Sequence, residues 1–453
     1  MDFLPVAVIA LIGVNTLLWA SVGAARAIRL RLVPPAISPR SSSAVRRSRV
    51  AVLIPAHDEA AVIAATVRSA RGQVPVDQIF VVSDGSSDDT ARVASAEGAN
   101  VIELAPNRGK AGAIVEAIAR FRLVERFDAV LLLDADTRLD GRYLESGLPA
   151  FDDPGVVAVA GRATSILDPP SETLLGRLLV AYRERFYVAV QYLLKYGQAA
   201  RSVNVVSIVP GFASMYRTGV LDRIEISAPG LVIEDFNMTF ELHAKRLGRI
   251  AFHPGSAIAR TQDPDRLVDY VKQMRRWTLG FWQTVRRHRV RPDRFWAALG
   301  LYMCELLVGS TVLLVMLALL VAFAATWIWA SATGDPTPMA TLASIVPPAV
   351  VVAGILVPDL LLTLVVVAIT GSPGFLRYAL AFPLVRAVDA VICIRTLVEA
   401  FRAGGTADGR WTSPLRRAQA ASDPTAEPGS GGGPGREPGP GTAPGAGPSR
   451  EAG

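Results

Sequence analysis

The sequence predicts an α/β protein in which a mostly parallel sheet domain is inserted between long apolar helices. From residue 49 to residue 292, short apolar runs alternate with helical patterns, which is typical of a parallel sheet covered by helices. Long apolar stretches stand on both sides of this region. Only 19% of the 453 residues are charged, whereas about 25% is usual in soluble proteins. Together these observations predict a membrane protein with one large folded domain.

Residues 1–25 are the first predicted membrane helix, because about 20 apolar residues suffice to cross a bilayer. A cleaved signal peptide is the competing interpretation, but Asp2 stands where such a peptide carries Lys or Arg. Arginines are frequent in the following segment, a basic linker over 26–48. Because basic flanks stay in the cytoplasm, we expect an uncleaved anchor with its amino terminus outside the cell.

The domain over 49–292 is expected to fold in the cytoplasm around five strands. Each candidate strand is a short apolar run with polar or turn-forming residues at its ends. The strands are expected at Val50–Ile54, Gln78–Val82, Asn100–Leu104, Ala129–Leu133 and Val156–Ala160. Helical patterns lie between several of them, as at Glu59–Arg71 and Gly109–Phe121.

Two further membrane helices are expected at 299–330 and 342–369, since both stretches are long and apolar. The short loop between them has no Lys or Arg, which suits the outer face of a plasma membrane. Residues 375–402 are apolar but carry several charges, so they form either an amphipathic helix at the interface or a fourth span. Residues 404–453 are rich in Gly and Pro and are expected to be disordered.

Acidic residues follow three apolar runs, and each run is expected to be a strand. Asp84 follows the second strand, Asp134 and Asp136 follow the fourth, and Glu234–Asp235 follow Leu231–Ile233. Ligands of parallel sheets bind at the carboxyl ends of strands, so these acids are expected to meet in one cleft. Asp134 and Asp136 would point the same way on an extended backbone and suit Mg²⁺ or Mn²⁺ on a diphosphate. A simple turn at a strand end explains the same acids without a ligand.

A fourth motif, QMRRW, occupies Gln273–Trp277 in an amphipathic stretch before the second apolar region. Taken alone, its arginines fit a basic membrane flank and its tryptophan fits an interfacial anchor. The net charge of the chain is +7, but its arginines gather at membrane flanks. Nucleic acid is therefore not an expected partner.

In this chain order the motifs make the sequence similar to inverting family 2 glycosyltransferases of the membrane-embedded kind. That family includes cellulose, hyaluronan and poly-N-acetylglucosamine synthases, and it implies a GT-A-like (Rossmann-like) domain. The motifs are PAHDE (Pro55–Glu59), SDGSSD (Ser83–Asp88), NRGKAGAI (Asn107–Ile114), DAD (Asp134–Asp136), PGFAS (Pro210–Ser214), ED (Glu234–Asp235) and QMRRW (Gln273–Trp277). The resemblance extends over roughly Val50 to His288.

The resemblance also implies a role for each motif. The nucleotide of a UDP-sugar donor would be held by Pro55, His57, Glu59, Asp84, Lys110 and Asp134. Asp136, with Asp134, would ligate the metal, and Asp235, with Glu234 beside it, would be the catalytic base. The acceptor and the diphosphate would be bound by Gln273, Arg276, Trp277, Gly211 and Phe212. Inversion would convert an α-linked donor into a β-linked product.

Three departures from the family pattern affect what the resemblance implies. His57 and Asp58 stand where the family often has Tyr and Asn, and Ser83 precedes Asp84 where a pair of acids is frequent. The membrane part is small, so a homo-oligomer or an accessory subunit would have to complete a polymer channel. The leading hypothesis is extension of a β-linked, poly-N-acetylglucosamine-like glycan. The alternative is a single addition to a lipid acceptor such as a polyprenyl phosphate, a diacylglycerol or a sphingolipid-like molecule.

An amphipathic helical stretch, Leu174–Tyr196, contains basic residues, three of which lie in its carboxyl-terminal part after Tyr182. These are Arg183, Arg185 and Lys195. They are expected to dock the helix at the membrane interface below the site, and direct contact with the acceptor is the alternative.

Overall fold

The computed structural model describes residues 13–32 and 44–402. The first half of the expected helix over 1–25, part of the basic linker over 26–48 and the tail over 404–453 lie outside these residues. The division of the chain into the expected segments stays a prediction.

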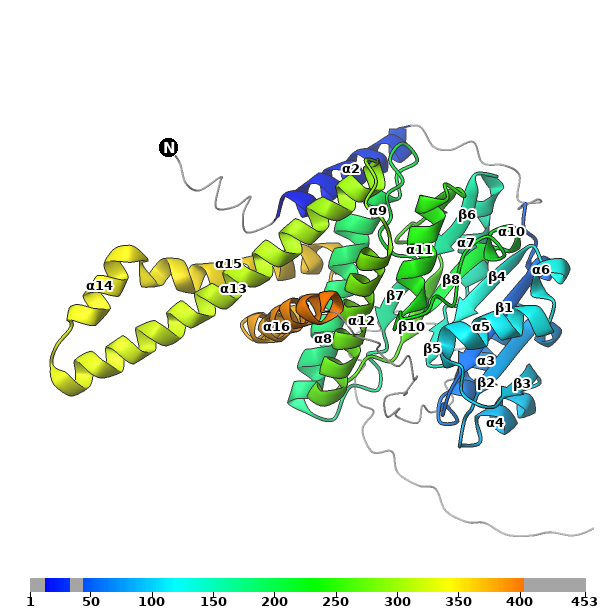
Figure 1. The fold of residues 1–453 in the computed structure, drawn as a ribbon, viewed down its shortest axis with the longest axis horizontal. Helices are drawn as coiled ribbons and strands as arrows, with labels where there is room; N and C mark the ends of the chain where they lie inside the picture. Colours follow the sequence, from blue (N-terminus) through cyan, green and yellow to red (C-terminus); the bar gives the residue numbers. More distant parts are fainter. Residues whose placement is uncertain (1–12, 33–43, 403–453) are drawn as a thin grey trace, which may run out of the picture. The chain divides into compact units, whose positions relative to one another are not determined.

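The central sheet has seven strands in the order β3-β2-β1-β4-β8-β6-β9 (Figure 1). Its strands are β1 (Val50–Ala56), β2 (Ile79–Asp84), β3 (Asn100–Leu104), β4 (Ala129–Leu133), β6 (Val156–Ala160), β8 (Ala213–Arg217) and β9 (Arg249–Ala251). All neighbours pair in parallel except β8, which is antiparallel to both β4 and β6. The prediction of a mostly parallel α/β sheet is therefore confirmed. A second sheet joins β5 (Thr137–Leu139), β10 (Ile258–Thr261) and β7 (Arg162–Ser165).

Strand β1 explains why the sheet needs helices on both faces. All seven of its residues are buried, and alternate side chains point to opposite faces. Val52 and Ile54 pack in one core with α3 (Ile63–Arg71), whereas Leu53 packs in the other with α5 (Gly109–Arg120). The remaining helices of the domain are α4 (Thr90–Ala96), α6 (Leu123–Arg126), α7 (Tyr143–Gly147), α10 (Thr218–Leu221) and α11 (Glu234–Ala244).

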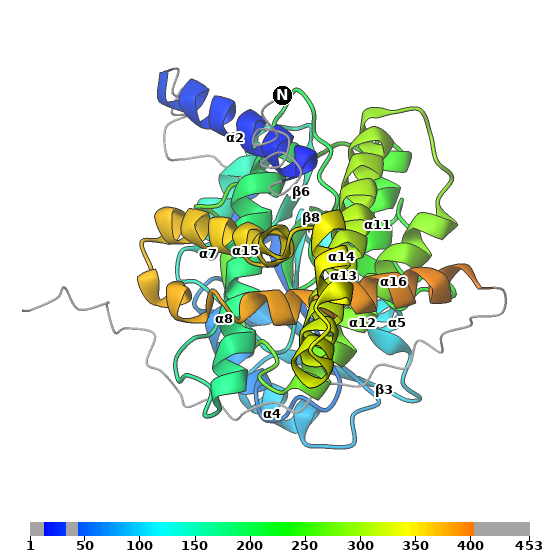
Figure 2. The ribbon, with the colours of Figure 1, turned by 90° about the vertical axis from the view of Figure 1, so that its left-hand side faces the viewer.

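A layer of helices lies beside the sheet and carries the amphipathic stretches noted in the sequence. It contains α8 (Leu174–Ala189), a π-helical segment (Val190–Lys195), α9 (Tyr196–Gln198), α12 (Leu267–Arg287) and α16 (Phe382–Phe401). Helix α12 packs along α16 and contacts α8. In Figure 2, α15 and α16 cross α8.

Helices α13 (Arg294–Thr333) and α15 (Pro348–Thr370) are the two helices in the described ranges that are long and apolar enough to cross a membrane. A separate helix, α14 (Thr337–Ile345), connects them. The second apolar span was expected to begin at residue 342 but begins at Pro348. The reason is the pair Pro347–Pro348, which cannot continue the preceding helix because proline lacks the backbone N–H.

The segments at either end of the described chain also differ in detail from the expectation. Helix α2 (Val14–Leu32) continues past residue 25, and Arg26 donates to the carbonyl of Tyr196 at 2.8 Å while lying over its ring. The segment expected over 375–402 divides into a 3-10 turn, Pro373–Tyr378, and α16. Whether α16 lies at an interface or spans a membrane stays a prediction, as does the outward orientation of the amino terminus.

Candidate active site

A cavity of about 510 Å³ lies between the carboxyl ends of the strands and helices α8, α11 and α12. It brings together most of the site residues predicted from the sequence. Those that line it are Glu59, Lys110, Asp134, Asp136, Gly211, Phe212, Glu234, Asp235, Gln273, Arg276 and Trp277. Pro55, His57 and Asp84 do not line it. The structure thus separates three residues expected at the nucleotide from the remainder of the site.

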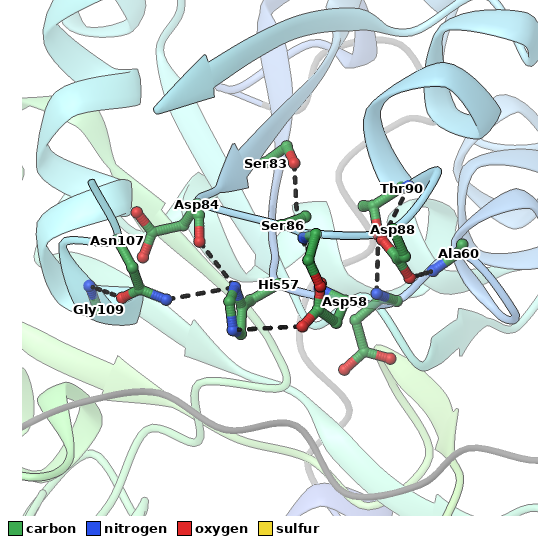
Figure 3. Close-up of polar contacts among 12 residues, drawn as sticks. His57, Asp58, Ala60, Ser83, Asp84, Ser86, Asp88, Thr90, Asn107 and Gly109 are labelled. Carbon is green, nitrogen blue, oxygen red and sulfur yellow. Dashed lines mark hydrogen bonds and ion pairs between the residues drawn. The ribbon is translucent and has the colours of Figure 1, made fainter. Parts of the chain in front are cut away.

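His57 directly follows β1 and Asp84 ends β2, and both belong to a cluster of polar contacts (Figure 3), whereas Pro55 lies within β1. The imidazole Nδ1 of His57 is 2.7 Å from the carbonyl oxygen of Asp84. This contact requires Nδ1 to carry the proton, since a carbonyl oxygen only accepts. The carboxylate of Asp58 accepts from the amide of Ser87 at 2.7 Å and closes the cluster from the opposite side. The first motif therefore braces the two strand ends against each other.

Asp84 connects this cluster to the start of α5. Its Oδ1 accepts from the amide of Arg108 at 2.8 Å, whereas its buried Oδ2 has no hydrogen-bond partner among the residues that the structure describes. Burial raises the pKa of this carboxyl group, although the hydrogen bonds from the helix start oppose the shift. An acceptor oxygen that is buried and unpaired marks a position where a ligand could donate.

Lys110, in the first turn of α5, neutralises two acids from different motifs. Its Nζ is 2.7 Å from Oδ1 of Asp134 and 2.9 Å from Oε1 of Glu234. The two carboxylates raise the pKa of Lys110 against the effect of burial, and Lys110 in turn lowers that of Glu234. A Cβ atom on Gly211 would lie only 3.1 Å from both Nζ of Lys110 and Oε1 of Glu234, so a larger residue here would displace the ends of these two side chains.

Asp134 and Asp136 do not lie on extended backbone, so that part of the prediction is wrong. The amide of Thr137 donates to the carbonyl of Asp134 at 3.1 Å and closes a turn after β4. The two carboxyl groups still lie near each other. Burial first, and the charge of Asp136 as well, raises the pKa of Asp134. Two hard carboxylates that repel each other at a cavity wall fit a divalent cation, which would relieve the repulsion.

The third acidic pair begins a helix and does not follow a strand, which corrects a second expectation. Glu234 and Asp235 are the first residues of α11, and the preceding residues 231–233 form no strand. The amide of Val232 donates at 3.1 Å to the side chain of Gln283 on α12 and not to a neighbouring strand. The start of α11 is also a favourable place for two carboxylates, because the helix dipole is positive there.

Asp235 is held by two backbone amides and faces the cavity. Its Oδ1 accepts from the amide of Phe236 at 2.7 Å and its Oδ2 from the amide of Gly211 at 3.2 Å. Burial, with the nearby charge of Glu234, raises the pKa of Asp235 to about 7. A carboxylate that titrates near neutrality can accept a proton at physiological pH and release it afterwards.

The QMRRW motif places Gln273, Arg276 and Trp277 on one face of α12, because residues three and four apart share a face. All three line the cavity. Oε1 of Gln273 and Nε of Arg276 are buried and have no hydrogen-bond partner among residues 13–32 and 44–402. These unpaired atoms are consistent with a polar ligand at this wall.

Trp277 is held by Arg183, a contact that the sequence did not predict. The guanidinium carbon of Arg183 lies 4.2 Å from the centre of a Trp277 ring. Arg183 is fixed in turn by Asp263, at 3.2 Å, and by the hydroxyl of Tyr187, at 2.8 Å. Asp263 closely follows β10, and the position of an acid after a strand was the signal that could have found it.

Arg183, Arg185 and Lys195 are all buried, which does not fit simple docking at an interface. Arg185 donates to the carboxylate of Asp359 on α15 at 2.7 Å, and Arg183 is the partner of Asp263. Lys195 lines the cavity. The charges therefore point into the protein, because each meets either an acid or the cavity.

Comparisons with known proteins agree with this geometry. Residues 47–280 match the family described as glycosyltransferase like family 2. An N-acetylglucosaminyltransferase of Azorhizobium caulinodans is 30% identical over 220 residues, which are 44% of this chain and 50% of that protein. A poly-β-1,6-N-acetyl-D-glucosamine synthase of Staphylococcus epidermidis is 24% identical over 256 residues, 53% of this chain and 58% of that protein. The chain thus spans about half the length of the curated relatives it matches.

Among solved structures, a mannosyltransferase from Pyrobaculum calidifontis in complex with GDP-mannose and Mn²⁺ is similar to 84% of this chain. The similarity covers 99% of that protein, with 17% identity and a TM-score of 0.43, and at that score it says nothing about what this chain binds. The family match, in contrast, covers more than half of the 453 residues and includes every strand of the central sheet. The chain, with its GT-A-like α/β domain, therefore belongs to glycosyltransferase-like family 2.

Proposed function

We propose that this protein is an inverting transferase that moves a hexose or N-acetylhexosamine from a UDP-sugar to the growing end of a β-linked polysaccharide. One observation carries the proposal: Asp235, a half-buried carboxylate with a pKa of about 7, shares a cavity with Lys110, Asp134 and Asp136 and with QMRRW. The names of the two curated relatives, an N-acetylglucosaminyltransferase and a poly-β-1,6-N-acetyl-D-glucosamine synthase, support N-acetylglucosamine as the sugar.

In this reaction Asp235 accepts the proton of the acceptor hydroxyl while that oxygen attacks the anomeric carbon. The bond from the anomeric carbon to the diphosphate breaks, and its electron pair leaves with UDP. Arg276 offsets the negative charge that grows on the leaving group. Attack from the side opposite to the diphosphate inverts the anomeric configuration. Glu234, paired with Lys110, keeps a negative charge beside Asp235 and so favours its proton-accepting role.

Asp134 and Asp136 would hold Mg²⁺ or Mn²⁺, which would neutralise charge on the donor diphosphate. Lys110 already satisfies one oxygen of Asp134 and so holds that carboxylate at the cavity wall. Asp84 and Glu59, with Pro55 and His57 behind them, would receive the nucleoside. The unpaired Oδ2 of Asp84 supports an interaction with a donor N–H or hydroxyl.

We further propose that the protein is a multi-pass plasma-membrane enzyme with its catalytic domain in the cytoplasm and its amino terminus outside. The two apolar helices α13 and α15 support this, as does the arginine-rich end of α2, which suits a cytoplasmic flank. A homo-oligomer or an accessory subunit would supply the further helices that a polymer channel needs.

A single addition to a lipid acceptor is the second candidate function. It is favoured by the far end of the cavity, where Tyr302 and Leu306 of α13 and Cys393 of α16 form part of the lining. An apolar wall built from potential membrane helices suits a lipid chain better than a hydrated glycan.

A donor panel tests the proposal. The full-length protein, purified in detergent, is incubated with Mn²⁺ and labelled UDP-sugars, and the product masses are recorded. A ladder of masses from one donor supports the polysaccharide synthase, whereas one increment on an added lipid supports the second candidate. Asp235→Asn should be inactive, and Asp222→Asn, at an exposed position outside the cavity, is the matched control. Equal turnover by wild type and Asp235→Asn would contradict the assigned base.

A further inference from the structure

Lys195 is a buried cation that has no acidic partner in the described part of the chain. Its exposed fraction is 4%. The other buried basic groups around the site are paired: Lys110 with Asp134 and Glu234, and Arg183 with Asp263. The ammonium group of Lys195 lies over the ring of Phe252, whose centre is 5.4 Å from Nζ. Lys195 nevertheless lines the same cavity as Asp235.

Keeping such a group buried is costly, because a cation out of water needs a partner charge or hydrogen bonds. The cost is visible in its pKa, which burial lowers to about 8. Asp235 opposes this shift through space, but the two side chains form no ion pair. A cation at a cavity wall that no protein acid neutralises is well suited to an anionic ligand.

The backbone around Lys195 holds it in this position. The residue ends a π-helical segment, Val190–Lys195, a rare geometry that is frequent at functional sites. Gln191 anchors the segment with two hydrogen bonds to the backbone of Ala163, at 2.7 and 2.8 Å. Lys195 thus belongs to a segment that is anchored to strand β7.

The wall next to Lys195 is apolar. Its neighbour Leu194 belongs to a hydrophobic cluster with Phe236, Phe281 and Leu306, and all four residues line the cavity. Leu306 comes from α13, one of the two helices able to cross a membrane. A ligand that pairs with the charge of Lys195 and also contacts this apolar wall must therefore combine an anionic group with an apolar part.

We infer that Lys195 binds the phosphate of an anionic lipid whose free hydroxyl is the sugar acceptor at Asp235. This inference rests on the second candidate function above, the single addition of a sugar to a lipid, and names that lipid acceptor. The attacking group is a hydroxyl and not the phosphate, because a phosphate oxygen is already ionised and needs no base. The hydroxyl proton passes to Asp235, the oxygen bonds to the anomeric carbon, and the electron pair of the broken bond leaves with UDP. The lipid phosphate is unchanged.

Binding measured without catalysis tests the anion site. The probe is dodecyl phosphate, added to the full-length protein in neutral dodecyl maltoside and followed by native mass spectrometry. Because a hydrogen bond between charged groups contributes about 1.5–3 kcal/mol, Lys195→Met should weaken binding by about tenfold or more. Lys195→Arg, which keeps the charge, should bind within a few-fold of wild type. Lys245→Met, at an exposed lysine of the domain, is the control and should bind as wild type does.

Two results would overturn the anion site. One is equal affinity of Lys195→Met and Lys245→Met for dodecyl phosphate. The other is inorganic phosphate binding as tightly as dodecyl phosphate, which would show that the apolar wall takes no part. Loss of binding through misfolding is checked by thermal unfolding: Lys195→Met removes an unpaired buried charge, so its midpoint should equal or exceed that of wild type.

Turnover separates this inference from the proposed function. With the donor found in the panel, wild type should glycosylate phosphatidylglycerol in phosphatidylcholine vesicles more efficiently than it glycosylates diacylglycerol. Lys195→Met should raise KM for phosphatidylglycerol and leave KM for the UDP-sugar unchanged. Equal use of both lipids by wild type would overturn the inference while the sugar transfer stands. If wild type turns over no donor but binds dodecyl phosphate through Lys195, the proposed function fails and the anion site stands.

Discussion

The two walls of the cavity differ in how their charged groups are satisfied. On the wall built from strand ends, Lys110 forms a tight set of ion pairs with Asp134 and Glu234. On the helical wall, Oε1 of Gln273 and Nε of Arg276 have no hydrogen-bond partner within the residues described, and the buried Lys195 forms no ion pair with them. Paired charges hold a fixed shape, whereas unpaired buried groups raise the energy of the free protein unless a ligand meets them.

This difference indicates which wall of the cavity is expected to determine the selectivity for each ligand. The strand wall is preorganised, so it suits a ligand common to the whole family, the nucleotide diphosphate. The helical wall is completed by what it binds, so it suits the acceptor. The predictions below test this contrast, from the largest expected effect to the smallest.

Replacing Asp235 with Asn should have the largest effect, because no other carboxylate has the same position between the two walls. Positioned general bases contribute about 10²–10⁴-fold to rate, so kcat should fall by about 10³-fold. The KM for the donor should change little, since Asp235 touches amides and not the strand-wall ion pairs. Steady-state kinetics measures both values. A rise in KM with kcat unchanged would assign Asp235 to substrate binding and would contradict the proposed difference between the two walls.

Replacing Lys110 with Met should lower the free energy of unfolding of the protein, because it removes the ion pairs of the strand wall. Breaking a buried ion pair costs about 3–5 kcal/mol. The side chain of Lys110 is 21% exposed and that of Asp134 33%, so solvent screening reduces the expected loss to about 2 kcal/mol. Thermal unfolding in detergent gives the direction, and the double variant Lys110→Met, Glu234→Gln should recover part of the loss. Full stability of the single variant would mean that the strand wall is not held by its ion pairs.

The strand wall was also the more predictable one. Strands such as β4 appear in the sequence as apolar runs because they are buried on both faces, and parallel strands end at one edge, so Asp84 and Asp134 could be expected near one site. The sequence predicted a strand before Glu234 and not the start of α11. A run of only three apolar residues, 231–233, is compatible both with a strand and with the segment that precedes a helix.

The helical wall was less predictable because its contacts join distant parts of the chain. Arg183 meets Asp263 across 80 residues and Arg185 meets Asp359 across 174. No periodicity in a single sequence encodes such pairs, so these arginines were expected to dock the helix at the membrane interface. For Lys195 the sequence left two roles open, docking at the interface and contact with the acceptor, because a buried lysine without a partner and an exposed lysine look the same in a single sequence.

Replacing Arg183 with Lys should disturb the helical wall selectively. Lysine keeps the charge but loses the planar stacking on Trp277 and the two-sided contact with Asp263 and Tyr187. We expect about a tenfold rise in KM for the acceptor, as for a loss of about 1.4 kcal/mol, with KM for the donor unchanged. Trp277→Ala should go further and abolish chain growth. Unchanged product length in Trp277→Ala would count against acceptor binding by this face of α12.

The pH dependence should show the smallest change. Asp235 is an acid whose pKa is raised to about 7, so it is protonated below that pH and unable to accept a proton. The value of kcat/KM should therefore fall as pH drops through 7, by about tenfold between pH 8 and pH 6. Glu234→Gln should move this midpoint down, because the charge of Glu234 is one of the two causes that raise the pKa of Asp235. Lys195→Met should move it up, since the lysine charge favours the ionised base. If the midpoint of the pH dependence is the same in both variants as in wild type, the titrating group lies elsewhere. The two walls would then not meet at Asp235.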